Sequence, residues 1–249
     1  MQISDDRKLV IQTMVGRVLI FILAPMAFCF IKIAGYRIRD LEKTRKTCRK
    51  YFKQHRGPWL ICANHLTMID SLILAYAMMP LYQAVFRFDR IPWNVPEKDN
   101  FHRNAAGRLI CYALKCIPVN RGGQREGVSA TLKKCITVLE KKQSLMIFPE
   151  GTRSRSGRIC TRDFPYGVGR LMASVPECNV LCMYARGDHQ KSYGFIPGYR
   201  EVFTIRTGIL HPVTNLKGLK AQRDMAGQII RQLSGMEKAY FAEYRKRHC

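Results

Sequence analysis

The sequence predicts an α/β domain, a single mixed sheet flanked by helices, preceded by an N-terminal membrane-associating helical segment. Short apolar runs alternate with stretches of helix length between residues 57 and 247, which is the pattern of strands and helices in one α/β sheet. The 249 residues are 47% apolar, enough for a buried core and too many for a disordered chain. We therefore expect membrane-associating helices and a polybasic stretch in residues 1–56 and the α/β domain in residues 57–249.

The N-terminal apolar run covers residues 18–31, which carry no charge, lie between Arg17 and Lys32 and contain Pro25 near their middle. A spanning helix needs about 20 apolar residues, so this run is short unless its flanking cations snorkel. Three interpretations stay open: a tilted span, a pair of helices bent at Pro25 that enters one leaflet, or a buried core helix. No A-x-A-like cleavage site follows, which argues against a signal peptide.

The charge balance of 42 Lys and Arg against 18 Asp and Glu gives a formal net charge of +24. Such an excess indicates a polyanionic partner, either nucleic acid or an anionic membrane surface. Residues 37–56 alone carry nine Lys and Arg against two acids, which suits a juxtamembrane polybasic stretch or a solvated helix face. The same bias favours the cytoplasmic face of the membrane, the inner membrane if the protein is bacterial.

The individual elements are predicted from apolar runs, period and turn residues. Strands are expected at residues 59–63, 82–88, 116–119, 145–148, 180–185 and 203–210. Helices are expected at residues 70–79, 104–115, 127–142, 166–174 and 216–247, with Ser129 opening the third. Residues 89–104, with two prolines and mixed charges, are the expected long loop.

The ten cysteines form no C-x2-C pair, and no nearby histidine completes a zinc pattern. Most lie among aliphatic residues, as small buried hydrophobes do. We expect reduced thiols in a cytosolic setting, and neither a metal nor a cysteine nucleophile is indicated.

His65 follows the first predicted strand, and Asp70 lies five residues further on. A neutral imidazole takes a proton from an alcohol, and a carboxylate in reach orients the ring. The spacing Thr67-x-x-Asp70 also fits a capping box, so a purely structural role for Asp70 stays open. The helix that begins at Asp70 could line an apolar groove beside His65.

A second motif, Phe-Pro-Glu-Gly-Thr-Arg-Ser at residues 148–154, begins where another apolar strand ends. Gly151 permits a positive φ, and backbone N–H groups, Thr152 and Arg153 could converge on a phosphate. A charged surface turn is the alternative. Arg121, after a short strand and before Gly-Gly, could add a second phosphate contact.

Taken together, Asn-His-x4-Asp at residues 64–70, Ile-Pro-Val-x-Arg at 117–121 and the motif at 148–154 resemble the PlsC-type glycerolipid acyltransferases. The best-known members are the lysophosphatidic acid acyltransferases. The similarity covers residues 59–185 and implies a glycerolipid acyltransferase-like fold.

The resemblance implies that His65 deprotonates the acceptor hydroxyl while Asp70 orients its ring and Asn64 supports the site. It assigns acceptor and phosphate binding to Arg121, Glu150, Gly151, Thr152 and Arg153. The acyl donor would be a thioester of CoA or acyl carrier protein, with no metal or bound cofactor. Membrane attachment through N-terminal helices is a property of bacterial members.

Three departures from the family pattern leave the acceptor open. Cys116 stands where a glycine precedes Arg121 by five residues, residues 180–184 lack a central proline, and residues 86–102 are more charged than the family pattern leads us to expect. We predict a phospholipid-biosynthetic O-acyltransferase that acts on a lysophospholipid, with 1-acylglycerol 3-phosphate as acceptor and phosphatidic acid as product. One alternative is a lyso-aminolipid or another specialised lipid as acceptor. The other is a basic nucleic-acid-binding module, against which the lack of interleaved aromatic residues argues, so no nucleic acid is expected as a partner.

Overall fold

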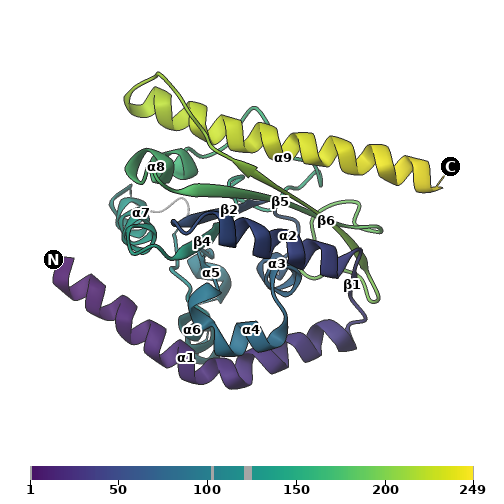
Figure 1. The fold of residues 1–249 in the computed structure, drawn as a ribbon, viewed down its shortest axis with the longest axis horizontal. Helices are drawn as coiled ribbons and strands as arrows, with labels where there is room; N and C mark the ends of the chain where they lie inside the picture. The colour runs from purple at the N-terminus through teal and green to yellow at the C-terminus, as the bar shows by residue number, and fades with distance from the viewer. Residues whose placement is uncertain (1, 102–103, 121–124, 249) are drawn as a thin grey trace.

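The computed structural model describes residues 2–101, 104–120 and 125–248. These residues contain one six-stranded sheet in the order β1-β6-β5-β2-β4-β3, with helices on both faces (Figure 1). All neighbouring strands are parallel except β5 and β6, which are antiparallel. The predicted class, an α/β fold with a single mixed sheet flanked by helices, is therefore confirmed.

The central strands are apolar along their whole length because helices cover both faces of the sheet. All five residues of β2 are buried. The strands are β1 Arg37–Ile38, β2 Trp59–Ala63, β3 Trp93–Asn94, β4 Ser144–Ile147, β5 Asn179–Gly187 and β6 Val202–Leu210. The predicted strands at 59–63, 145–148, 180–185 and 203–210 are confirmed, with shifts of one or two residues at some ends.

The two faces of the sheet contain separate cores, and alternate residues of β2 belong to each. Leu60 and Cys62 pack with α7 Arg125–Glu140, α8 Gly167–Ser174 and α9 Gly218–His248. Ile61 packs on the other face, where α2 Leu41–Gln54 and α3 Asp70–Met78 lie. The sheet thus holds the carboxyl ends of β2, β4 and β5 in one fixed row.

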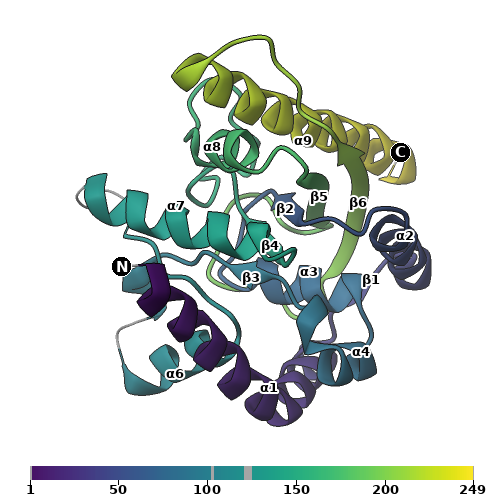
Figure 2. The ribbon, with the colours of Figure 1, turned by 60° about the vertical axis from the view of Figure 1, so that its left-hand side comes forward.

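The remaining helices are α1 Gln2–Ile33, α4 Leu81–Phe86, η1 Phe88–Arg90, α5 Lys98–Phe101 and α6 Ala105–Ala113. Helix α1 runs along the outside of α4 and α6 (Figure 2). It continues through Pro25, so of the three interpretations left open, the pair of helices bent at this proline is wrong. A proline inside a helix costs about 3 kcal/mol, and here packing of Ile20, Ala24 and Ile31 on either side of it holds the helix together.

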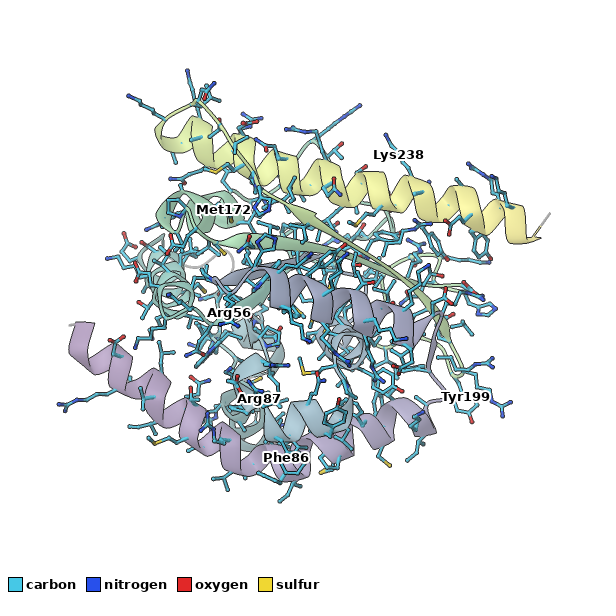
Figure 3. All side chains as sticks on the ribbon, viewed as in Figure 1. Arg56, Phe86, Arg87, Met172, Tyr199 and Lys238 are labelled. Atoms are coloured by element: carbon cyan, nitrogen blue, oxygen red, sulfur yellow. The ribbon has the colours of Figure 1, made fainter. Side chains whose placement is uncertain are left out.

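The predicted strand at 82–88 is wrong, because these residues form α4 and the start of η1. Ala84 and Val85 pack against α1, whereas Phe86 projects outward beside α1 (Figure 3), which is a helical distribution of apolar residues. The expected long loop at 89–104 is also wrong in part. It contains β3, where Trp93 is fully buried and pairs with β4, and α5.

Two further boundaries differ from the prediction. Cys116 and Val119 make only isolated bridges to residues 94 and 97, so 116–119 is not a full strand. Helix α7 already includes Arg125, so Ser129 lies inside it and does not open it. The predicted burial of most cysteines is confirmed, since six of the nine described ones are buried.

Residues 37–54 form β1 and α2, which belong to the sheet and to its helical layer. The division of the chain at residues 56 and 57 stays a prediction.

Candidate active site

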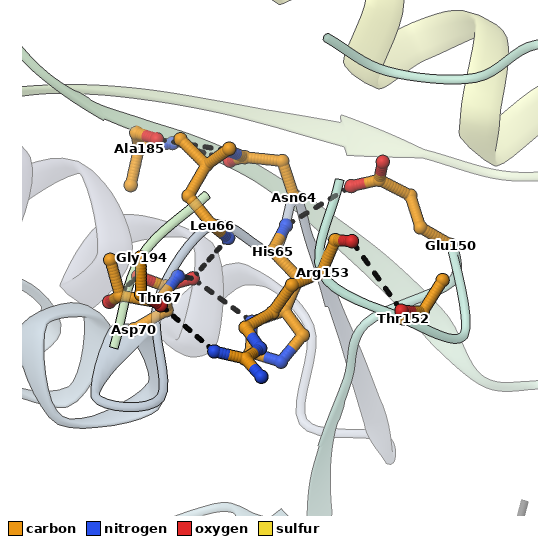
Figure 4. Close-up of polar contacts among 10 residues, drawn as sticks. All are labelled: Asn64, His65, Leu66, Thr67, Asp70, Glu150, Thr152, Arg153, Ala185 and Gly194. Carbon is orange, nitrogen blue, oxygen red and sulfur yellow. Dashed lines mark hydrogen bonds and ion pairs between the residues drawn. The ribbon is translucent and has the colours of Figure 1, made fainter. Parts of the chain in front are cut away.

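His65 and Glu150 meet at the carboxyl edge of the sheet, the edge at which α/β proteins place their ligands. His65 follows β2 and Glu150 follows β4, and these strands are parallel neighbours. The backbone N–H of His65 donates to Oε1 of Glu150 at 3.1 Å, and the N–H of Ser154 donates to the carbonyl of His65 at 2.9 Å. These bonds join the two sequence motifs into one site, and Figure 4 shows the bond between His65 and Glu150.

The imidazole of His65 is held by Asp70, the first residue of α3. Nδ1 of His65 lies 3.0 Å from Oδ2 of Asp70. The same carboxylate accepts bonds from the N–H groups of Leu66 at 2.6 Å and Thr67 at 2.8 Å, and from the Thr67 hydroxyl at 2.5 Å. The two roles considered for Asp70 are therefore compatible, because one carboxylate fixes the turn and contacts the ring. With Nδ1 paired, Nε2 is the nitrogen left for a substrate proton.

Two neighbours fix the position of the His65 ring and its turn. The ring of Phe148 stacks on the imidazole, with 4.0 Å between centroids and an angle of 12°. The side chain of Asn64 donates to the carbonyl of Ala185 at 2.9 Å and accepts from its N–H at 2.7 Å, which ties the end of β2 to β5. Asn64 thus lies where a supporting residue is expected, although this role stays a prediction.

Glu150 points inward, with 8% of its surface exposed. Burial raises the pKa of its carboxyl to about 7, opposed by the hydrogen bond from the His65 backbone and reinforced by the Glu237 and Asp70 carboxylates. A buried carboxyl that accepts a backbone N–H is a brace for the His65 turn. This contact was not predicted, since sequence alone does not reveal which way a side chain in a turn points.

The Gly-Thr-Arg turn contains a glycine that no other residue replaces without strain. Gly151 has φ of +73°, and a Cβ at this position would lie 2.5 Å from Cγ of Pro165. Nη1 of Arg153 donates to the carbonyl of Gly194 at 2.9 Å, and the N–H of Gly194 donates to the carbonyl of Leu66, the residue after His65. Arg153 is thus held close to the imidazole. Thr152 is exposed on the same turn.

Arg121, the second predicted phosphate ligand, lies outside the described residues. Asn120 before it is exposed, and Val119 is bridged to Glu97 beside the same edge of the sheet.

Comparison with known proteins identifies the family of this chain. Residues 35–186, more than half of the chain, match the family model described as Acyltransferase. The chain belongs to the acyltransferase family. It is also similar to a 1-acyl-sn-glycerol-3-phosphate acyltransferase of Borreliella burgdorferi, with 31% identity over 108 residues. That alignment covers 43% of this chain and 38% of the relative, so the chain matches less than half of the relative's length. The predicted family is confirmed, and the match begins at residue 35, ahead of the motifs.

This acyltransferase has a largely apolar cavity of about 670 Å³ next to His65. Its lining includes Phe148, whose ring stacks on the imidazole, together with Glu150, Thr152, residues 163–166 and residues of α7 and α8. No residue of α3 lines this cavity, so it is not the apolar groove beside α3 that the sequence suggested. The apolar residues of α3 instead pack into the cores beneath the sheet.

The lining from α7 was not identified from the sequence. Val128, Thr131 and Leu132 face the cavity from successive turns of this helix. Their three- and four-residue spacing is the available signal, although the same spacing fits any buried helix. Among residues 2–101, 104–120 and 125–248, no three His, Cys, Asp or Glu side chains are grouped so that they could hold a metal ion.

Proposed function

We propose that this acyltransferase moves a fatty acyl group from a thioester of CoA or acyl carrier protein to the hydroxyl of a lysophospholipid. The proposed acceptor is 1-acylglycerol 3-phosphate, which gives phosphatidic acid. The observation that carries the proposal is the His65–Asp70 pair, whose imidazole stacks on Phe148 in the lining of an apolar cavity. Arg153 is bonded to Gly194, which is bonded to Leu66, the residue after His65. The similarity to a 1-acyl-sn-glycerol-3-phosphate acyltransferase supports this choice of acceptor.

In the proposed reaction, Nε2 of His65 takes the proton of the acceptor hydroxyl as its oxygen attacks the thioester carbonyl. The new C–O ester bond forms, the C–S bond breaks, and the imidazolium returns the proton to the departing thiolate. Asp70 stabilises the imidazolium through its contact with Nδ1. No step requires a metal or a bound cofactor.

Substrate placement follows from the chemistry of the surroundings. The apolar cavity has the volume of a small-molecule site and suits an acyl chain whose carbonyl lies beside His65. The acceptor phosphate would lie at Arg153, because a guanidinium fork binds phosphate through paired hydrogen bonds. Arg121 is proposed as the second phosphate ligand.

The test is to incubate purified full-length protein with a panel of lysophospholipids and lyso-aminolipids, each with acyl-CoA and with acyl carrier protein thioesters. Products are identified by mass spectrometry. Phosphatidic acid made by the wild type and lost by about 10²-fold or more in His65→Ala is the expected result. His211→Ala is the matched control, because it removes an exposed histidine whose ring lies beside His55, ahead of β2. Product from another acceptor alone, or an active His65→Ala protein, would contradict the proposal.

A membrane location for the enzyme is proposed from α1. Among the described residues, α1 is the one helix long and apolar enough to cross a membrane. Its inner side, however, packs against the protein along most of its length, from Leu9 through Ile20 to Ile31. Gln12 adds hydrogen bonds to the carbonyls of Tyr112 at 3.0 Å and Cys116 at 2.9 Å. We infer that α1 lies flat in one leaflet, since a helix attached along its side does not cross a bilayer alone.

The outer side of α1 is a continuous apolar face. Its exposed large apolar residues are Val10, Ile11, Met14, Val18, Phe21, Ile22, Met26, Phe30 and Ile33. Phe86 of α4 extends this face, since it is 72% exposed and its ring meets that of Phe21 edge to face at 6.0 Å. Residues 7–33 contain four cations and no acid. An apolar face edged by cations fits an anionic leaflet, which we propose to be the cytoplasmic one.

Two exposed native cysteines make this location testable. Cys29 is an exposed residue of α1. Cys160 is exposed in a loop across the sheet from α1, where the N–H of the preceding residue, Ile159, donates to Glu237 of α9. Anionic vesicles should protect Cys29 from a water-soluble maleimide and leave Cys160 reactive. Equal labelling of both thiols on vesicle-bound protein would rule out insertion of α1.

A further inference from the structure

A second cavity, of about 200 Å³, lies at the opposite edge of the sheet from His65. Trp59 and Ser144, the first residues of β2 and β4, form part of its lining. The length of β2, about 15 Å, separates it from the candidate active site. None of the motif residues at 64–70 or 148–154 lines it, so it is not part of the catalytic site.

The rim of this cavity is strongly basic. Five cationic side chains line it, contributed by α2, η1 and the residues that follow α2 and α7: Arg49, Lys53, Arg56, Arg90 and Lys142. The lining holds a single carboxylate, Asp89, which is paired with Arg87 at 3.5 Å. Among the described residues, no ion pair involves any of the five cations. Figure 3 labels Arg56 and Arg87 near this region.

Helix termini neutralise only part of this charge. Helices α2, α3 and α7 all end at the cavity, and a helix C-terminus carries roughly half a negative charge. After these termini and Asp89 are counted, a surplus of about two and a half positive charges remains. Stabilising the helix ends therefore does not account for all five cations.

The interior of the cavity is apolar below this rim. Phe52, Trp59, Met78 and Met79 line it, and Trp59 is fixed by a hydrogen bond from its Nε1 to the carbonyl of His55 at 3.0 Å. A ligand that fits both the basic rim and the apolar interior has a small head with two or more negative charges, joined to a short apolar portion. Phosphate matches the head, because guanidinium groups bind its oxygens in pairs.

We propose that this basic cavity binds a phosphate-bearing ligand, either the headgroup of an anionic lipid or a soluble phosphate ester, at a site separate from the catalytic centre. Arg49, Arg56 and Arg90 hold the phosphate, and the apolar interior holds the adjoining carbon chain. The proposal goes beyond acyl transfer and does not depend on the identity of the acceptor.

Calorimetric titration of the full-length protein with inorganic pyrophosphate tests the site. The titration uses Arg153→Ala protein, so that phosphate binding at the catalytic edge does not contribute. Further substitution of Arg49→Ala with Arg90→Ala should weaken binding at least about tenfold, as expected for the loss of charge-assisted bonds. Lys217→Ala with Lys220→Ala, which removes two exposed cations elsewhere, is the control and should leave binding unchanged.

A variant that narrows the cavity distinguishes a ligand bound inside it from anions attracted to its surface by charge alone. Gln83 lines the cavity from α4 and is partly exposed, so Gln83→Trp should narrow the cavity without changing its charge. Loss of pyrophosphate binding in Gln83→Trp supports the site. Equal weakening by the control pair, or full binding in both the Arg49/Arg90 and Gln83 variants, overturns it.

The same titration, repeated with vesicles, identifies the source of the phosphate. Displacement of pyrophosphate by phosphatidylglycerol vesicles, and not by phosphatidylcholine vesicles, assigns the site to a lipid headgroup. Displacement by glycerol 3-phosphate alone assigns it to a soluble ester. Failure of both probes to displace pyrophosphate from the wild-type cavity counts against the proposal.

Discussion

Replacing Asp70 with asparagine should separate the electrostatic role of this residue from its structural one. Oδ2 of Asp70 accepts bonds from His65 Nδ1 and from the N–H groups of Leu66 and Thr67, while Oδ1 accepts from the Thr67 hydroxyl. An asparagine oxygen in the place of Oδ2 keeps the three N–H acceptor contacts. Its NH₂ group then faces the Thr67 hydroxyl, which rotates to accept. The turn therefore survives, but the negative charge is lost.

The lost charge sets the size of the effect. A full charge pair at the observed 3.0 Å is worth about 5 kcal/mol at an effective dielectric constant of roughly 20, and both side chains are largely buried. This is an upper limit to the stabilisation of the imidazolium in the transition state. We expect kcat to fall by about 10²-fold to 10⁴-fold, whereas the free energy of unfolding falls by only about 1–3 kcal/mol because charge-assisted bonds become neutral ones.

The assay compares kcat of wild type and Asp70→Asn with the product detection described above, together with denaturant unfolding of each protein. Thr67→Val is the control, because it removes one hydrogen bond of the same carboxylate and leaves the charge on Asp70. It should lower stability by about 1 kcal/mol and leave kcat close to wild type. Asp70→Asn protein with nearly wild-type kcat, or Thr67→Val protein that loses as much activity, would refute the electrostatic role.

Three further substitutions test other parts of the site, and a fourth, Gly127→Ala, serves as a control. Burial raises the folded-state pKa of Glu150 to about 7, so the protonated carboxyl stabilises the fold at low pH, and this stabilisation is lost as pH rises from about 4.5 to 7. Glu150→Gln should remove this pH dependence of the free energy of unfolding in denaturant titrations. At pH 8 the variant should be more stable than the wild type by up to about 3 kcal/mol. Arg153→Ala should raise the acceptor KM about tenfold in initial-rate measurements, and a change in the donor KM alone would contradict phosphate binding. Gly151→Ala should destabilise by about 1–3 kcal/mol through its positive φ and contact with Pro165, whereas Gly127→Ala, with open space at its Cβ position inside α7, should raise the melting temperature.

The sequence predicts the central sheet and the position of the motif residues at its carboxyl edge because both depend on local signals. The apolar runs at β2, β4 and β5 are long enough to require burial on two faces, and the polar motifs begin where these runs stop. Parallel pairing of β2 with β4 then brings His65 and Glu150 together. The contact between His65 and Asp70 is likewise local, since five residues separate them and the first turn of α3 returns the carboxylate to the ring.

Sequence reasoning fails where an element takes its structure from a distant partner. Residues 82–88 are apolar in a pattern that fits a strand or a helix, and the packing of Ala84 and Val85 against α1 decides for the helix. The 89–104 segment likewise gains a strand because Trp93 pairs with β4. In both cases the residues in contact are more than 50 positions apart, as Ala24 is from Ala84 and Trp93 from Leu145, so no local pattern contains the answer.

The motifs by themselves determine the family and the chemistry available to this protein, because imidazole, carboxylate and guanidinium groups at fixed spacing act over a few ångströms. Only the tertiary structure decides what surrounds them. It turns Glu150 inward as a brace for His65, forms the apolar cavity from α7 and α8 rather than α3, and lays α1 along the protein with its apolar face outward. These features depend on contacts between residues remote in sequence, whose burial is settled by the packing of the whole chain.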